Sequence, residues 1–156
     1  MKKVLLLALV FAACEQTEHS AVTETKTVVV SNDTIPELRS TVGTKPVAAF
    51  SLPVEDELND WKFAVYAYET KNRFRYRLNM QYKELRITDS LDIPNFGIEP
   101  RLELRKGPET YSCIIGFLDK QQTFREYKKA FVKNEQFTFT TLNHYYVGTY
   151  KTPRKP

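Results

Sequence analysis

The residue types that most often perform chemistry are scarce in this chain. Its 156 residues include two cysteines, Cys14 and Cys113, and two histidines, His19 and His144. Because Cys14 has a different predicted role, described next, the remaining three are too few for a four-ligand zinc site. The five glycines form no phosphate-binding loop, and no serine has the flanking glycines of a nucleophile elbow. We therefore predict that the protein is not an enzyme and needs no cofactor or metal.

Cys14 closes a short segment with the composition of an export signal. Two lysines follow Met1, and Val4 to Ala13 carry no charge. A membrane-spanning helix needs about 20 apolar residues, whereas a basic start, a brief apolar stretch and small final residues are typical of a cleaved signal peptide. Phe11-Ala12-Ala13-Cys14 also resembles the lipobox of bacterial lipoproteins, with Phe11 in place of the more usual leucine.

The lipobox resemblance implies that Cys14 is acylated and becomes the N-terminus of the mature protein. Two or three acyl chains anchor a protein stably to a membrane, although one alone does not. The resemblance therefore implies a protein anchored by lipid to the outer membrane, on its periplasmic or its surface face. Lipidation of Cys14 leaves Cys113 without an intramolecular disulfide partner. The apolar neighbours of Cys113, from Tyr111 to Ile115, predict a buried structural thiol.

Acidic clusters offer a second kind of chemistry. Glu55 to Asp60 carry enough oxygens for calcium, but they lack the EF-hand spacing and its glycine, and a solvated loop is the simpler interpretation. Asp89 and Asp92 are predicted to flank a loop, and carboxylate pairs can hydrolyse glycosides. Nothing in the sequence places Asp89 and Asp92 in a cleft, so no catalytic residue is predicted. His144 is interpreted as a solvated residue at a strand end.

Arginines and tyrosines form the candidate interaction surface. In the segment RFRYRLNMQY (73–82), alternate residues are arginine or amide, which predicts one strand face carrying a row of guanidiniums about 7 Å apart. Nearby acids such as Glu69 can neutralise the row; otherwise it can bind carboxylates or phosphates in bidentate fashion. Tyrosine is enriched in protein interfaces and also stacks on sugars. The predicted surface comprises Arg73, Arg75, Arg77, Tyr145 and Tyr146.

Strands must position these residues. Strict alternation over 73–82 predicts a strand with one wet face, and 61–69 is expected to pair with it across a turn at 70–72. The alternation changes phase after Lys83-Glu84, which we interpret as a β-bulge or a strand that crosses between sheets. Further strands are predicted at 98–105, 111–118, 136–142 and 145–151. The segment 123–133 has helix-like spacing, and we favour a strand or extended connection there.

About seven short strands and at most one short helix predict an all-β, two-sheet antiparallel β-sandwich. The segment NEQFTFTTL (134–142) resembles a late strand of transthyretin-like sandwiches, with Glu135 in place of their glycine. The predicted organisation is a signal peptide (1–13), a lipidated flexible tether (14–45) and a sandwich domain (46–156). A possible short strand at 27–30 is the one break in the tether.

Charge separates the two parts of the mature chain. From Cys14 to Asp60 there are nine acidic residues against three basic ones, whereas from Trp61 onward there are 18 basic residues against ten acidic ones. The simpler explanation of this charge difference is that an acidic tether repels anionic headgroups and a basic domain stays soluble. The alternative is that a basic face of the domain binds an acidic protein, glycan or lipid headgroup.

A short tether followed by a transthyretin-like sandwich resembles the outer-membrane lipoprotein subunit of type VI secretion membrane complexes. The resemblance implies a structural or assembly subunit of an envelope complex, with a protein partner and no nucleic-acid partner. Two other functions stay open. One is a lipoprotein that binds a glycan or another ligand through tyrosines and Trp61, and the other is a periplasmic inhibitor or immunity protein.

Overall fold

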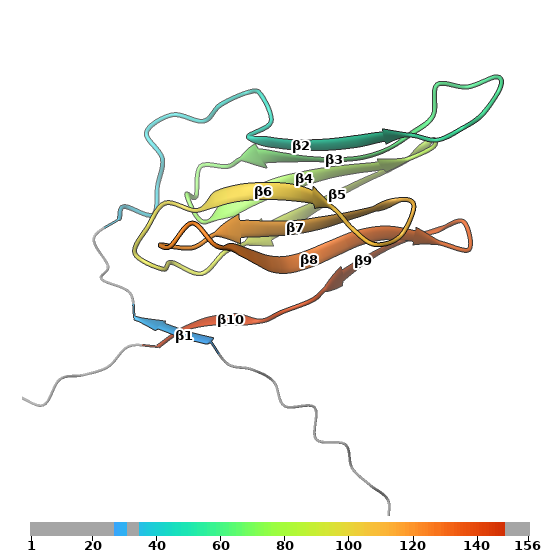
Figure 1. Ribbon diagram of the computed structural model, residues 1–156. Coiled ribbons are helices and arrows are strands. Elements are labelled where there is room, and N and C mark those ends of the chain that lie inside the picture. Colours follow the sequence, from blue (N-terminus) through green and yellow to red (C-terminus); the bar gives the residue numbers. More distant parts are fainter. Residues whose placement is uncertain (1–26, 31–34, 149–156) are drawn as a thin grey trace, which may run out of the picture.

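The computed structural model describes residues 27–30 and 35–148, and this part of the chain consists of strands, turns and loops without a helix (Figure 1). Eight strands form two antiparallel four-stranded sheets, so the predicted two-sheet β-sandwich is confirmed. The first sheet contains β2 (Ala48–Pro53), β3 (Lys62–Glu69), β4 (Arg75–Tyr82) and β5 (Leu85–Asp92). The second contains β6 (Arg101–Lys106), β7 (Ser112–Leu118), β8 (Phe124–Lys133) and β9 (Gln136–Thr141).

Each sheet is a simple meander. The strand order follows the sequence, β2-β3-β4-β5 and β6-β7-β8-β9, and one connection between β5 and β6 joins the sheets. All turns therefore gather at two opposite ends of the sandwich. We call the end with the β3–β4 turn the strap end and the end with the β4–β5 turn the turn end (Figure 1).

Strand β4 shows why the sequence folds this way. Its residues alternate between buried and more exposed, and the apolar members face the second sheet. The pairing of β3 with β4 across the turn at 70–74 agrees with the predicted hairpin. The buried core combines these residues with the inner residues of β3, β5 and β7, chiefly Phe63, Val65, Leu78, Met80, Leu91, Cys113, Ile115 and Phe117.

The phase change after Tyr82 has a different cause from the one predicted. Lys83 and Glu84 form a two-residue turn, and Tyr82 pairs with Leu85, so the chain reverses into β5 rather than bulging or crossing between sheets. Lys83 has a φ of 52°, a left-handed conformation that glycine or asparagine adopts more readily. Because lysine is uncommon at this position of a hairpin turn, the sequence did not indicate the turn. It also follows that Asp89 and Asp92 lie within β5 and do not flank a loop.

The segment with helix-like spacing is strand β8, as favoured from the sequence. The pairing of β7 with β8 shifts between Ile115 and Gly116, which leaves Tyr127 as an extra residue at a β-bulge. A bulge shifts the period of two by one residue. Together with aromatic residues on both faces of the strand, this shift produces the spacing that resembles a helix.

The turn between β8 and β9 contains Asn134 and Glu135, with φ values of 51° and 59°. Two residues with positive φ are the signature of the type I′ hairpin turn, which favours Asn-Gly. Glu135 thus adopts a glycine-like conformation at the position where the transthyretin-like pattern has glycine. Its carboxylate accepts hydrogen bonds from Lys83 Nζ (2.6 Å) and Tyr82 Oη (3.1 Å), so it links the turns of the two sheets.

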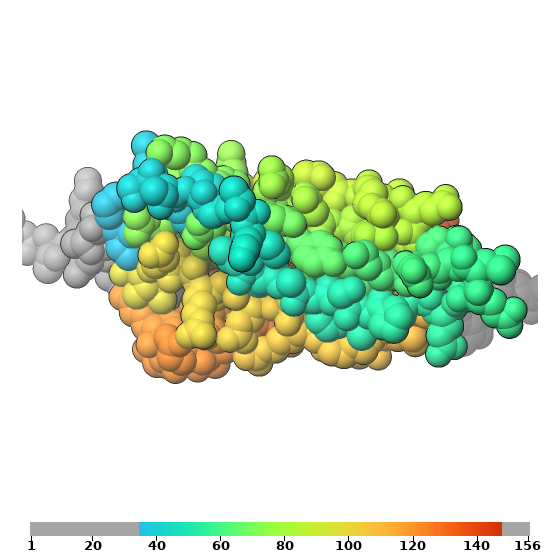
Figure 2. Space-filling model, turned by 90° about the horizontal axis from the view of Figure 1, so that it is seen from above, coloured from blue at the N-terminus to red at the C-terminus, as the bar shows by residue number. Residues whose placement is uncertain are grey.

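The segments at the two ends of the described chain meet beside the strap end. Strand β1 (Thr27–Val30) pairs in parallel with β10 (Tyr145–Gly148). Residues 35–45, here called the strap, cross the strap end from this region to β2 (Figure 1). Figure 2 shows the strap at one end of the molecule and the loop 54–61 at the other. The part of the predicted tether after residue 34 is therefore attached to the sandwich domain by defined contacts.

Candidate interaction surface

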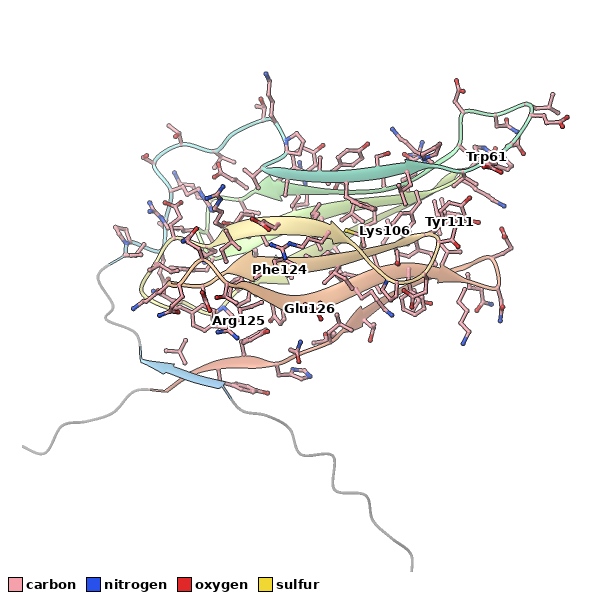
Figure 3. The ribbon with its side chains drawn as sticks, in the orientation of Figure 1. Trp61, Lys106, Tyr111, Phe124, Arg125 and Glu126 are labelled. Carbon is pink, nitrogen blue, oxygen red and sulfur yellow. The ribbon has the colours of Figure 1, made fainter. Side chains whose placement is uncertain are left out.

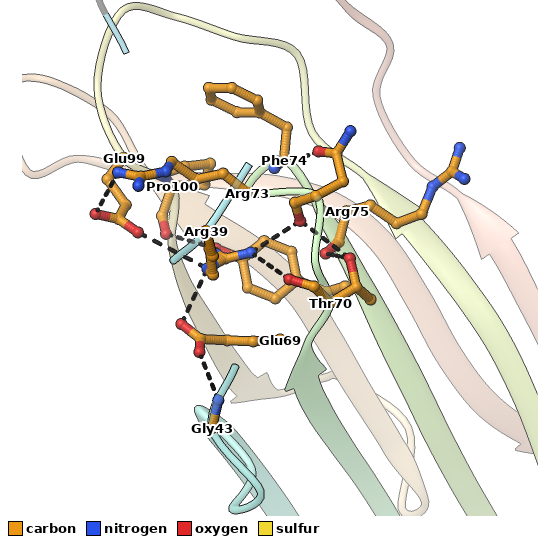
Figure 4. Close-up of polar contacts among 11 residues, drawn as sticks. Arg39, Gly43, Glu69, Thr70, Arg73, Phe74, Arg75, Glu99 and Pro100 are labelled. Carbon is orange, nitrogen blue, oxygen red and sulfur yellow. Dashed lines mark hydrogen bonds and ion pairs between the residues drawn. The ribbon is translucent and has the colours of Figure 1, made fainter. Parts of the chain in front are cut away.

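The most elaborate polar cluster lies where the strap meets the β3–β4 turn, and Arg39 is its centre (Figure 4). Only 5% of the Arg39 surface is exposed. Its guanidinium donates hydrogen bonds to the carbonyl oxygens of Asn72 (2.8 Å) and Thr70 (3.2 Å) and to Tyr76 Oη (3.0 Å). Tyr76 Oη in turn donates to the carbonyl of Pro100 (2.9 Å). One side chain therefore joins the strap, the first sheet and the connection between the sheets.

Carboxylates balance the buried charge. Arg39 Nε lies 3.2 Å from Glu69 Oε1 and 3.9 Å from Glu99 Oε1, close enough for ion pairs, although it is not aligned for a hydrogen bond. The second oxygen of Glu69 accepts the backbone N–H of Gly43 (3.2 Å), so the strap is held at two points. Burial raises the pKa of Tyr76, and the nearby Arg39 only partly opposes this effect.

Backbone bonds complete the attachment. The N–H of Arg39 donates to the carbonyl of Lys71 (2.9 Å), and the N–H of Arg73 donates to that of Glu37 (2.6 Å). Leu38 and Asn72 form an isolated antiparallel bridge. A short piece of sheet thus surrounds the buried arginine. Such a cluster fixes the path of the chain, because moving the arginine would leave a buried charge and several buried acceptors without partners.

The three predicted arginines do not form one row. Arg73 belongs to the β3–β4 turn, and its Nη1 lies 3.4 Å from Glu99 Oε2. Arg75 is exposed but forms an ion pair with Asp92 (2.6 Å), its partner on β5. Arg77 has no acidic partner among the described residues, and its guanidinium lies over the ring of Tyr68, 5.0 Å from the ring centre. Glu69, the acid expected to neutralise the row, pairs with Arg39 instead.

Arg77 lies on the outer face of the first sheet. The register places it beside Tyr68 of β3 and Ser90 of β5. Lys62 lies over Tyr66 in the same way, 5.7 Å from the ring centre. Because side chains alternate between the two faces of each strand, the register places four basic residues and one charged acid on this face. The basic residues are Lys62, Arg75, Arg77 and Arg86, and the acid is Asp92. The face is therefore basic, hydrogen-bonding and aromatic at once.

On the outer face of the second sheet, one aromatic ring packs directly over a glycine. The Phe124 ring lies over Gly116, and a Cβ at Gly116 would collide with that ring and with the backbone of Arg125. The Arg105 guanidinium also lies over this ring, 3.8 Å from its centre. Figure 3 shows Phe124 beside Arg125 and Glu126 on β8. Glycine is thus required there to admit the ring, and the cation shields it from water.

The two predicted tyrosines have different environments. Tyr145 is half-buried among Phe117, Tyr127 and Phe96, with ring centres 5.1–6.4 Å away, and its hydroxyl donates to the carbonyl of Glu126 (2.8 Å). Tyr146 is 49% exposed and stacks on His144. The structure therefore assigns Tyr145 to packing and leaves Tyr146 at the surface, on a strand that belongs to neither four-stranded sheet.

A hollow of about 500 Å³ lies at the turn end beside Trp61. Its lining includes the acidic side chains Asp56 and Asp60 together with Asn59, and Lys83 lies over the indole, 5.2 Å from its centre. Asp56 accepts the N–H of Leu58 (3.0 Å) and the amide of Asn59 (2.8 Å), and these hydrogen bonds lower its pKa. Figure 3 shows Trp61 at the same end as Tyr111 and Lys106.

The cysteines divide between the described and the undescribed parts of the chain. Cys113 is fully buried, and burial raises the pKa of its thiol to about 12, as expected for a structural cysteine. Cys14 and His19 lie outside the described residues. Within residues 27–30 and 35–148, no group of three or more acidic, histidine or cysteine side chains is arranged to hold a metal ion. The same residues contain no helix long and apolar enough to cross a bilayer.

The described chain thus belongs to the class of all-β proteins with two packed antiparallel sheets. Comparison of the sequence with protein-family models and with curated proteins, and of the fold with solved structures, gave no match. The arguments on function below therefore use the residues and geometry of this chain alone.

Proposed function

We propose that this protein is a membrane-anchored lipoprotein that acts as a structural or assembly subunit of a bacterial envelope complex. The observation that carries the proposal is the Arg39 cluster. It fastens the chain that leads from the predicted lipid anchor at Cys14 to one end of a rigid sandwich. An anchor joined at one end presents the two outer faces and the turn end to other proteins.

The outer face of the first sheet supplies the contact surface in this proposal. Arg77 has no acidic partner among the described residues, and Arg75 is 56% exposed despite its pairing with Asp92. Arginine binds carboxylates in a bidentate geometry and is enriched in protein interfaces. An acidic surface of an envelope protein is the partner that fits. A type VI secretion membrane complex is the finer form of the proposal, and it rests on the resemblance in architecture.

Two measurements test the proposal. Cys14→Ala is expected to leave an uncleaved precursor that a membrane pellet no longer retains, and normal maturation would contradict the anchor. In-cell crosslinking of the tagged full chain, followed by mass spectrometry, is expected to recover large envelope proteins. Arg77→Glu should abolish that recovery, whereas Lys133→Glu, an exposed charge reversal on β8, should not. Recovery of the chain alone from every sample would overturn the assembly role.

A ligand-binding lipoprotein is the second candidate, and the hollow beside Trp61 favours it. Sugar sites often combine an aromatic face with carboxylates and amides, as Trp61, Asp60 and Asn59 do. The tyrosines of the first sheet favour it less, because Lys62 and Arg77 already lie over Tyr66 and Tyr68. Titration of the full chain with a broad glycan set should change Trp61 fluorescence if this candidate is correct. A flat response throughout would count against it.

A further inference from the structure

Strand β5 is the outermost strand of the first sheet, and no described strand pairs with its far side (Figure 1). Seven of its eight residues are exposed or half-exposed. The opposite edge strand, β2, lies close to β6 and ends at Pro53, which has no N–H to offer. An open edge strand is a template for another strand, and proteins usually protect it by charge, proline or a bulge. β5 has neither proline nor bulge.

The register shows which backbone groups of β5 are open. Ile93 N–H donates to the carbonyl of Phe74 (2.8 Å), so odd-numbered residues of this segment bond to β4. Because backbone groups alternate in direction along a strand, the N–H and C=O of Arg86, Thr88 and Ser90 point away from β4. These groups are free to form the backbone hydrogen bonds of an additional strand.

The inner side of β5 is apolar but incompletely covered. Leu85 is 48% exposed, and Ile87 is only partly buried against the core, whereas Leu91 is fully buried. A strand added to this edge with apolar residues on its inner side would cover Leu85 and Ile87. Alternate residues of that strand would lie on the outer face, next to Arg86.

Asp89 interrupts the apolar inner side. It occupies the inner position between Ile87 and Leu91, yet it is exposed. Its carboxylate accepts the N–H of Ser90 (2.7 Å), one of the groups that point to the open edge. A charge at an inner position of an edge strand blocks pairing with any strand that brings an apolar or acidic residue opposite it.

A second copy of the chain is the first strand to consider. In an antiparallel β5–β5 pair, the register that places Arg86 opposite Asp92 on both sides also matches Thr88 with Ser90. The same two-fold axis sets Asp89 directly opposite Asp89, in a non-hydrogen-bonded pair whose Cα atoms are only about 4.5 Å apart. Like charges in that position oppose pairing. The edge is therefore complementary to itself at every position except the central one.

We propose that β5 accepts an extended segment of a partner protein that carries a basic side chain opposite Asp89, and that Asp89 rejects a second copy of this chain. The segment adds a fifth strand to the first sheet, places apolar residues over Leu85 and Ile87, and places an acid opposite Arg86. Backbone bonds supply affinity and the charges supply selectivity. That the partner belongs to an envelope complex rests on the proposed function, whereas the edge property does not.

Two labelled peptides test the charge rule on the purified full chain. Each copies residues 84–93, one unchanged and one with Asp89→Lys. Fluorescence anisotropy is expected to show binding of the lysine peptide at least about tenfold tighter than that of the unchanged peptide, because an attractive central pair replaces a repulsive one. A chain with Asp89→Lys is expected to reverse the preference. Equal binding of both peptides, or binding of neither, overturns the proposal.

A proline variant and an oligomer measurement separate the edge from other surfaces. Thr88→Pro removes an outward N–H and a weak side-chain bond to Asn79, but it leaves the backbone bonds to β4 intact. The variant should therefore fold normally by circular dichroism and lose the lysine peptide. Sedimentation should show a monomer for the native chain and self-association for Asp89→Ala, but not for the neighbouring charge change Glu84→Gln. A native dimer through β5 would overturn the exclusion of a second copy. None of these measurements depends on Cys14 or on recovery of a partner from cells, so this inference and the proposed function can fail separately.

Discussion

The two ends of the sandwich use charged residues in opposite ways. At the strap end, Arg39 is almost completely buried and satisfies groups from three parts of the chain. At the turn end, Lys83 and Glu135 also join separate elements, but the glutamate side chain is 72% exposed. Removing one member of a buried ion pair leaves an uncompensated charge, whereas exposed pairs contribute little. The strap end should therefore depend on its arginine far more than the turn end depends on its lysine.

Arg39→Ala tests this difference most directly, and we expect the largest effect from it. The change removes the ion-pair partner of Glu69 and the hydrogen bonds that Arg39 donates to the Tyr76 hydroxyl and to two carbonyls. Losing one partner of a buried pair typically costs about 3–5 kcal/mol in the free energy of unfolding. Urea denaturation measures the loss. Arg75→Ala is the matched control, because Arg75 pairs with Asp92 in solvent, and its midpoint should remain close to that of the native protein.

Equal midpoints for Arg39→Ala and Arg75→Ala would break the comparison between the ends. That result would mean that water enters the strap end and solvates its charges. Hydrogen exchange in Arg39→Ala distinguishes local detachment of the strap from a loss of stability in the whole domain. If the strap detaches while the sandwich persists, hydrogen exchange should increase first at the N–H groups of residues 39 and 73, which bond the strap to the β3–β4 turn. Exchange in β7 should increase only later.

Tyr76→Phe sharpens the comparison with a smaller change. Phenylalanine keeps the buried ring beneath Arg39 but removes the hydroxyl that accepts from Arg39 and donates to Pro100. A buried group that loses its hydrogen-bond partner costs about 1–3 kcal/mol, so this variant should lie between Arg39→Ala and the native protein. Urea denaturation measures it, with Tyr66→Phe on the outer face as control. No loss in Tyr76→Phe would show that the ring alone supports the arginine.

The two ends also differed in how far the sequence could predict them. Alternation in 73–82 correctly predicted β4, because a strand with one buried face must repeat every two residues. The turn end was misjudged at Lys83-Glu84, since neither residue is typical of a two-residue hairpin turn. Both features are local, so neighbouring residues carry the information. The sequence correctly located the phase change after Tyr82, but it predicted a bulge or crossing where the chain forms a tight turn.

The central role of Arg39 could not be predicted from neighbouring residues. The acceptors of its hydrogen bonds lie 31, 33 and 37 residues further along the chain, and two of them are backbone carbonyls that no side-chain pattern marks. A single arginine in a polar segment is typical of a flexible tether. The same limit applies to Tyr145, whose aromatic partners come from separate strands, so a residue expected at the surface was found in a packed cluster.

Glu135→Gly tests the turn end, where two small effects oppose each other. The change removes the carboxylate bound to Lys83 and Tyr82, which should destabilise the protein slightly. It also places glycine at a φ of 59°, a conformation that glycine adopts without the cost borne by other residues. We expect the denaturation midpoint to stay near the native value or to rise. Glu135→Ala, which loses the ion pair without that relief, should be the less stable of the two.

The pH dependence of Glu135 should give the smallest effect. Hydrogen bonds from Lys83 and Tyr82 hold the pKa of this carboxyl below the ordinary glutamate value of 4.5. A folded pKa below the unfolded one means that the contribution to stability is complete above about pH 4.5 and is lost as the pH falls through the folded pKa. The native protein should therefore lose slightly more stability than Glu135→Gln between pH 6 and pH 3, measured by urea denaturation at each pH. Parallel curves for the two proteins would show that the exposed pair contributes nothing, which would widen the contrast with the buried arginine at the strap end.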